Sequence, residues 1–85
     1  MRTSEAIIGA RVKALIPFVD VPVGTEGVID EDYGTGVMVA WDLPGRPLPS
    51  GYRAHDGRSA VASRLLRDGF DKESELDYLR LVSAP

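Results

Sequence analysis

The stretch 24–42 constrains the fold of this 85-residue chain more than any other segment. It begins with a Gly-Thr-Glu-Gly turn and a short apolar run, and an acidic, glycine-containing connection at 30–36 then leads into a second run at 37–42. The second run reads Val-Met-Val-Ala-Trp-Asp, so its larger side chains recur at every second residue, as in a β-strand with one buried face. The stretch therefore predicts two strands joined by a hairpin. We expect the buried face of the second strand to consist of Val37, Val39 and Trp41.

Two further runs predict the neighbouring strands. Apolar residues alternate with two basic residues over 10–16, which predicts a half-buried strand that ends at the following proline, with Ile16 on its inward face. The run at 26–30 is the next strand, and we expect Val28 to face the core and Ile29 to lie on the other face. Successive strands of this kind indicate an all-β domain.

The connection between the first two strands, residues 17–24, is unusually apolar for a loop. Phe18, Val19 and Val21 lie between two prolines, and we expect at least one of them to pack under the sheet. The loop ends in Pro-Val-Gly-Thr, which fits a type II turn with Gly24 at the position that requires a positive φ.

The chain after Trp-Asp returns to the sheet by a long excursion. Residues 43–52 contain three prolines and two glycines, so they cannot form regular structure. We therefore treat 43–67 as an extended loop or insert within a single domain of residues 1–85, in which the run at 60–66 is compatible with a helix or with a strand. The rest of the chain is expected to form a connection at 68–73, one short helical turn at 74–78 and a closing strand at 79–82.

The aromatic residues divide between the core and the loops. Trp41 and Tyr78 fall in predicted regular structure, and we expect them in the core or at its edge. Phe18, Tyr33 and Tyr52 lie in loops, where a ring either packs against the loop or, if exposed, anchors a partner. An exposed ring among these three would mark a recognition site.

The charges are distributed unevenly, although the formal net charge is only −3. Residues 46–67 carry five arginines and one acidic residue, whereas both flanking segments are net negative. The arginines either neutralise their acidic neighbours within the fold or form a patch that binds phosphates. The net negative charge disfavours a general nucleic-acid binder.

Catalysis and metal binding are poorly supported by the sequence. There is no cysteine, so disulfides and thiolate metal sites are excluded. Asp30 and Asp32 alternate as in a calcium loop but lack its later glutamate, and His55 stands beside Asp56 without a serine or cysteine nucleophile pattern. We therefore expect no metal, no cofactor and no enzymatic activity, and a catalytic role for His55 is the least favoured hypothesis.

The apolar segments are short throughout the chain. No run approaches the ~20 residues that a membrane-spanning helix needs, and the first residues are polar and unlike a signal peptide. The absence of cysteine fits a reducing compartment. We expect a cytoplasmic protein that does not associate with membranes.

The order of these elements resembles that of an SH3-like β-barrel. A strand, an apolar loop, a glycine turn, a hairpin ending in Trp-Asp, and one helical turn before a closing strand follow one another as in such barrels. The resemblance covers 9–42 and 68–83, and 43–67 is an enlarged connection. It implies a small barrel of about five strands with one short helical turn before the last strand.

Three branches of that superfamily share features with this chain, and each departs from it. Photosystem I subunit IV and its relatives are non-catalytic docking subunits, but they have no counterpart of the proline- and arginine-rich excursion. KOW-type barrels bind RNA or proteins with a basic surface near the glycine turn, whereas acidic residues follow that turn here. Peptide-binding SH3 domains hold proline-rich, basic ligands with acidic loops and aromatic rings, and their aromatic groove residues have no one-for-one match here.

We therefore expect a non-enzymatic protein-interaction or accessory module that binds another protein through the acidic hairpin 30–36 and the excursion 43–67. The alternative is a nucleic-acid-associated module that uses the arginines of 46–67 as a phosphate-binding patch. The residues expected to contact the partner are Asp30, Glu31, Asp32, Tyr33, Arg46, Tyr52, Arg53 and Arg58.

Overall fold

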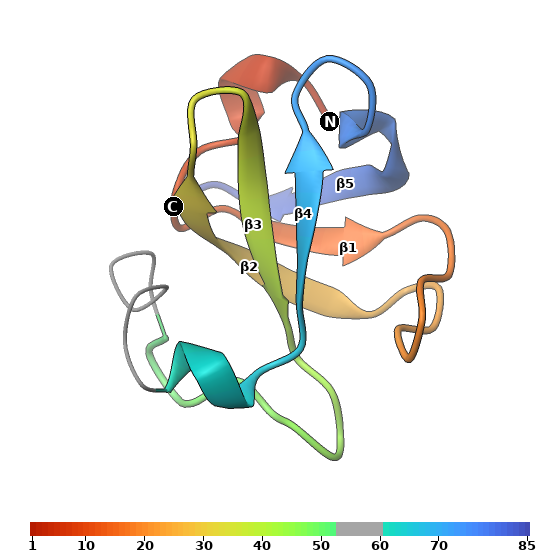
Figure 1. The fold of residues 1–85 in the computed structure, drawn as a ribbon, viewed down its shortest axis with the longest axis vertical. Helices are drawn as coiled ribbons and strands as arrows, with labels where there is room; N and C mark the ends of the chain where they lie inside the picture. The colour runs from red at the N-terminus through yellow and green to blue at the C-terminus, as the bar shows by residue number, and fades with distance from the viewer. Residues whose placement is uncertain (53–60) are drawn as a thin grey trace.

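Five antiparallel strands form one sheet in the computed structural model, which describes residues 1–52 and 61–85 (Figure 1). Their order across the sheet is β4-β3-β2-β1-β5. The strands are β1 (Arg11–Ala14), β2 (Glu26–Asp32), β3 (Gly36–Trp41), β4 (Arg67–Asp71) and β5 (Leu79–Ser83). Short 3₁₀ helices in the described residues are η1 (Thr3–Glu5), η3 (Ala62–Arg64) and η4 (Leu76–Tyr78).

The sheet is strongly bent. Figure 1 shows β3 and β4 running across the direction of β1 and β5, with β2 between the two pairs. The register of β2 against β3 shifts between Ile29 and Glu31, which marks a β-bulge, and bulges bend and twist a strand. β4 and β5 are the edge strands of this order, so the sheet is not a closed barrel.

The expected all-β fold, with a short helical turn before the last strand, is confirmed: η4 directly precedes β5. The fourth strand differs in position, because residues 62–64 form η3 and the strand begins at Arg67. Asp68 and Gly69 have low strand propensity, so the sequence pattern hides β4. The strand forms because it pairs with β3 along its whole length.

Trp41 lies at the centre of the core. It is fully buried together with Val37 and Val39, which confirms the inward face expected for β3. The Phe18 ring stacks on Trp41 with centroids 5.9 Å apart, and Phe70 meets these two rings edge-on at 5.3 and 6.2 Å. Aromatic pairs in these geometries contribute beyond the area that they bury.

The loop between β1 and β2 packs partly into the core, as its composition predicts. Val21 is buried and Phe18 is half-buried, whereas Val19 is 86% exposed. Tyr78 contacts Phe18 edge-on at 6.4 Å and stays 37% exposed, so it lies at the edge of the core as expected. The inward position expected for Ile16 is wrong, because β1 ends two residues earlier and the chain then bends, which leaves Ile16 exposed.

The same loop ends in a tight turn at the position expected. Gly24 has a φ of 87°, and the Thr25 N–H donates to the Pro22 carbonyl over 3.1 Å. The Thr25 hydroxyl donates to that carbonyl over 2.7 Å. A side chain would strain this positive φ, which accounts for the glycine.

β2 buries side chains on both of its faces, although the sequence assigns only Val28 to the core. Both Val28 and Ile29 are buried, and it is Ile29 that belongs to the central hydrophobic cluster. Gly27 shares the inward face with Ile29 and makes room for β3. A Cβ atom at Gly27 would lie 2.9 Å from a ring carbon of Trp41 and 2.8 Å from Val39 Cγ1. Gly27, the smallest residue of β2, therefore lies on the core face of the strand. A hydrophobicity pattern does not reveal this, because glycine has no side chain to count.

The outer face of β2 and β3 is also partly buried. Val28 and its register partner Ala40 have almost no exposed surface, and Asp30 has none. Figure 1 shows residues 43–52 and η3 beside the end of β3 and the start of β4. Ala62, in η3, is buried as well. The Tyr52 hydroxyl reaches Asp30 on this face, so part of the excursion packs against the sheet.

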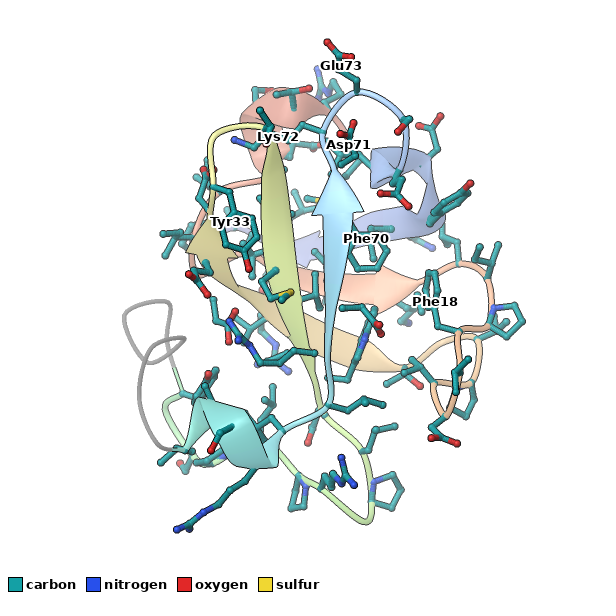
Figure 2. All side chains as sticks on the ribbon, in the orientation of Figure 1. Phe18, Tyr33, Phe70, Asp71, Lys72 and Glu73 are labelled. Carbon is teal, nitrogen blue, oxygen red and sulfur yellow. The ribbon has the colours of Figure 1, made fainter. Side chains whose placement is uncertain are left out.

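The end of β4 is held by the turn that follows it. The Asp71 N–H donates to Glu75 Oε1 over 2.8 Å, and the Glu75 N–H donates to the Asp71 carbonyl over 2.9 Å. Asp71 Oδ1 accepts hydrogen bonds from the N–H groups of Glu73 and Ser74 at 2.8 and 3.1 Å. Figure 2 shows Asp71 and Glu73 at this turn. Both backbone groups of the last residue of β4 are thus occupied within the chain.

The position of Gly27 predicts a packing defect when a methyl group is added there. Gly27→Ala is expected to lower the free energy of unfolding by about 1–3 kcal/mol, the usual cost of overpacking a core. The added methyl collides with the backbone and side chains of β3, which its ladders to β2 and β4 hold in place. Chemical denaturation followed by the fluorescence of the single tryptophan measures the change.

Gly45→Ala is the matched control. Nothing lies within 4 Å of a Cβ placed at Gly45, and its φ is not positive. We expect this variant to change the free energy of unfolding by less than about 0.5 kcal/mol. Equal losses in both variants would contradict the packing explanation.

Candidate functional site

Arg67, the first residue of β4, organises a cluster of charged side chains on the outer face. Its Nε donates to Asp30 Oδ2 over 2.9 Å and its Nη2 donates to Asp30 Oδ1 over 2.8 Å, so the guanidinium binds the carboxylate in a bidentate manner. Nη2 also donates to Glu31 Oε1 over 2.9 Å. The Tyr52 hydroxyl donates to Asp30 Oδ2 over 2.7 Å. The Asp30 carboxylate, which has no exposed surface, is therefore bonded within the chain.

The Arg67 cluster joins three segments that are far apart in sequence. Asp30 and Glu31 lie in β2, Tyr52 belongs to the excursion and Arg67 begins β4. The hydrogen bond to Asp30 raises the pKa of Arg67, burial opposes that rise, and Glu31 supports it. Because a buried carboxylate without its partner costs several kcal/mol, the cluster fixes the excursion to the sheet.

The hairpin between β2 and β3 has its own internal contacts. Asp32 Oδ1 accepts hydrogen bonds from the Gly34 N–H over 2.7 Å and from Lys72 Nζ over 2.9 Å. These contacts lower the pKa of Asp32, and the hydrogen bond from Gly34 is the largest cause. The Tyr33 ring is 53% exposed, and Figure 2 shows it and Lys72 beside this hairpin. The hairpin therefore presents the aromatic ring of Tyr33 to solvent as well as its charged side chains.

The residues expected to contact a partner do not form one surface. Those in the Arg67 cluster are Asp30, Glu31 and Tyr52. Those in the hairpin are Asp32 and Tyr33. Arg46 is exposed and lies apart from both groups, in the turn that follows β3. Arg53 and Arg58 lie outside the described residues. Contact of these residues with a partner stays a prediction, but burial removes Asp30 from any accessible surface.

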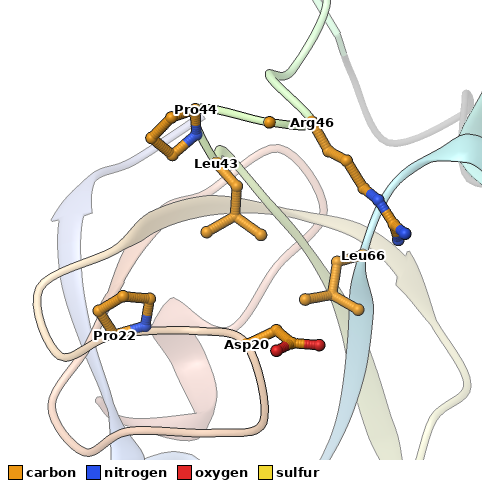
Figure 3. Close-up of a pocket in the computed structure, with 7 residues that line it drawn as sticks. Asp20, Pro22, Leu43, Pro44, Arg46 and Leu66 are labelled. Atoms are coloured by element: carbon orange, nitrogen blue, oxygen red, sulfur yellow. The ribbon is translucent and has the colours of Figure 1, made fainter.

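A groove of about 400 Å³ lies between the β1–β2 loop and the start of the excursion (Figure 3). Asp20 and Pro22 line it from the loop, residues 43–46 line it from the excursion, and Leu66 lines it from the residue before β4. Figure 3 shows the Asp20 carboxylate and the Arg46 guanidinium at this opening, with Leu43 and Leu66 nearby. We call this site the Asp20–Arg46 groove.

Two tight turns form the walls of the Asp20–Arg46 groove. Phe18 and Val21 exchange two backbone hydrogen bonds of 2.9 Å, and Leu43 and Arg46 exchange two of 3.3 and 3.0 Å. Asp20 has a φ of 63°, and it is the one residue other than glycine with a positive φ in the described part of the chain. Aspartate tolerates this left-handed region better than most residues, although the conformation still costs free energy. The walls of the groove are therefore fixed before any ligand arrives.

The two charges of the groove are available for binding. Neither the Asp20 carboxylate nor the Arg46 guanidinium forms an ion pair or hydrogen bond with another side chain within residues 1–52 and 61–85. The residues between them are mainly proline and leucine. Such an arrangement can hold an apolar side chain and pair with charges on either side of it.

Sequence reasoning identified Arg46 but missed Asp20 and Leu66. The available signal was an acidic residue at the tip of an apolar loop flanked by prolines, which predicts a turn and does not say what faces it. Leu66 is missed because the sequence pattern hides the start of β4.

The described residues offer no evident place for a metal. No group of three or more His, Cys, Asp or Glu side chains could hold an ion in this part of the chain. Every buried side-chain nitrogen or oxygen has a hydrogen-bond partner there.

Comparison with known proteins gives no relative for this chain: no family model, no curated protein and no solved structure matches it. Among the residues that the structure describes, no helix has the length and apolar character needed to cross a bilayer.

The buried pair predicts that removing one partner is far more damaging than removing both. Arg67→Met leaves the Asp30 carboxylate unpaired and is expected to lower the free energy of unfolding by about 3–5 kcal/mol. Tyr52→Phe removes one hydrogen bond to that carboxylate and is expected to cost about 1.5–3 kcal/mol. Urea denaturation measures both.

The double variant Asp30→Leu with Arg67→Met is expected to recover most of the loss, because the fully buried carboxylate is removed together with its partner, whereas the carboxylate of Glu31 that stays behind is partly exposed. Arg80→Met, on the exposed side of β5, is the control and should stay within about 0.5 kcal/mol of wild type. A double variant no more stable than Arg67→Met alone would show that the cluster does not act as a charge pair.

The lowered pKa of Asp32 predicts a dependence of stability on pH. A carboxyl with a lowered pKa in the folded chain stabilises fully above its unfolded pKa of about 3.9, and this contribution is lost as the pH falls through the folded pKa. Lys72→Met removes one of the two main causes, so the pKa of Asp32, followed by NMR titration, is expected to rise toward its ordinary value. Lys13→Met, the other lysine of the chain, should leave that titration unchanged. An unchanged Asp32 titration in Lys72→Met would count against the ion pair.

Proposed function

We propose that this chain is a non-enzymatic cytoplasmic module that binds a segment of another protein in the Asp20–Arg46 groove. The observation that carries the proposal is the groove itself, in which apolar residues lie between a carboxylate and a guanidinium that have no partners among the described side chains. The segment that fits it presents an apolar side chain between a basic and an acidic group.

The strained backbone of Asp20 supports this use of the groove. A glycine would adopt the same φ at little steric cost, yet the position carries an acid that lines the groove. Strained conformations concentrate at sites where a side chain must be held in a particular place.

The order of the strands supports assignment to the SH3-like barrels, which we keep as part of the proposal. Strands β1, β2 and β3 each pair with the next strand in sequence, β5 pairs with β1, and a single 3₁₀ turn precedes β5 after β4. Loops carried on a rigid sheet are common binding surfaces. In this arrangement the sheet positions the two turns, and the turns make the contact.

The proposal moves the contact surface away from the acidic hairpin. Asp30 and Glu31 are bonded to Arg67, whereas Arg46 and the exposed Tyr33 ring stay accessible. The same bonds weaken the alternative of a phosphate-binding patch, because Arg67 already pairs with two carboxylates. No contact in the described residues favours nucleic acid over protein.

A peptide selection tests the proposed function. Random peptides displayed on phage are selected against the immobilised wild-type protein, and the affinities of the selected peptides are measured by fluorescence anisotropy. We expect Arg46→Glu to weaken binding at least about tenfold, which corresponds to about 1.4 kcal/mol. Asp20→Asn keeps a residue that tolerates the left-handed backbone and removes only the charge, so it should weaken the same peptides without unfolding the chain.

Arg80→Glu changes the charge by the same amount as Arg46→Glu on a distant strand, and it should leave affinity unchanged. Peptides that bind Arg46→Glu and Asp20→Asn as tightly as wild type would rule out the groove as the binding site.

A further inference from the structure

We infer that the partner received by the Asp20–Arg46 groove is a second copy of the same chain, related by a two-fold axis. The inference rests on the proposed function and specifies its partner. In such a pair each copy inserts the tip of its 18–21 turn into the groove of the other. The same patch then serves both copies, as a two-fold interface requires.

The first argument is that the turn that lines the groove through Asp20 also carries an exposed apolar residue. Val19 is 86% exposed, more than any other large hydrophobic residue in the described part of the chain. It stands at the tip of the turn whose next residue, Asp20, lines the groove. Val19, Pro22, Leu43 and Leu66 would together supply the apolar part of such an interface. A copy turned by two-fold rotation presents its Val19 to this groove.

The second argument is that the charges of the face are self-complementary. The groove carries one carboxylate from Asp20 and one guanidinium from Arg46, and neither has a partner among the described side chains. In a two-fold pair, Asp20 of each copy meets Arg46 of the other, so the same ion pair forms twice and every one of the four charges has a partner. A face with charges of a single sign would repel its own copy.

The third argument is that the inserting turn has a fixed shape. Phe18 and Val21 close it with two hydrogen bonds of 2.9 Å, and the Phe18 ring packs against Trp41 in the core. A turn that is already ordered loses little conformational entropy on binding. The element that enters the groove is therefore prepared for insertion in the free chain.

The face is small for a protein–protein interface. A standard interface covers about 800 Å² on each partner, which is a large share of the 5019 Å² that this chain exposes. The groove is lined by seven residues, fewer than the roughly 20–30 residues that each partner contributes to a standard interface. We therefore expect a weak, reversible dimer with a Kd of about 10 μM to 1 mM.

A charge-exchange experiment tests the inference. Sedimentation equilibrium is measured from about 10 μM to 1 mM for wild type, Asp20→Arg and Arg46→Glu. Wild type is expected to dimerise, and each single variant is expected to associate at least tenfold more weakly, because like charges then face each other. An equimolar mixture of the two variants should dimerise again, since every contact in the mixed pair joins opposite charges.

Two further variants separate the groove from general effects of charge and hydrophobicity. Val19→Ser should also weaken association, because it removes the inserted side chain. Arg80→Glu should not, although it changes the net charge as Arg46→Glu does. Circular dichroism of each variant verifies that its fold is intact.

The possible outcomes distinguish this inference from the proposed function. Wild type that stays monomeric to 1 mM, or a mixture that does not associate, overturns the second copy as partner. If such a monomer still binds selected peptides through Arg46, the groove has a foreign partner and the proposed function stands. If the wild-type protein neither self-associates nor binds peptides at the groove, the further inference and the proposed function are both wrong.

Discussion

The bidentate contact between Arg67 and Asp30 is the interaction on which the rest of this structure depends. A sheet of five short strands would leave the outer face of β2 and β3 exposed, and burial of a carboxylate there is tolerable only with a matched cation. Because the cation begins β4 and the Tyr52 hydroxyl reaches the same carboxylate, one cluster ties both Tyr52 of the excursion and the start of β4 to β2. The start of the excursion and the residue before β4 then lie where they can line a groove.

The acidic residues at 30–32 are all bonded to other side chains of the chain. Asp30 and Glu31 stabilise the fold by pairing with Arg67, and Asp32 in the hairpin forms an ion pair with Lys72. The two charged residues that line the groove, Asp20 and Arg46, lie outside this acidic stretch.

The sequence was sufficient to predict structural features that follow from a repeating pattern within one strand. The alternation around Trp41 located the core face of β3, and the apolar loop and the last helical turn followed from local chemistry. The sequence could not predict contacts between residues that are far apart along the chain. Nothing near Asp30 in the sequence indicates that its partner, Arg67, lies 37 residues away. Gly27 misled the assignment of faces in β2, because a position that requires the absence of a side chain looks neutral to a hydrophobic pattern. β4 was hidden for a related reason, since Gly69 and its charged neighbours form a strand only opposite β3.

The turn that closes β4 also bears on how this protein behaves when crowded. An open sheet has two edges, and an edge with unoccupied backbone groups can add strands from other chains without limit. Here Glu75 occupies both backbone groups of Asp71 at one end of such an edge, and charged side chains precede it on the same strand. Growth by strand addition along β4 is therefore obstructed, so close approach of two molecules need not lead to fibres.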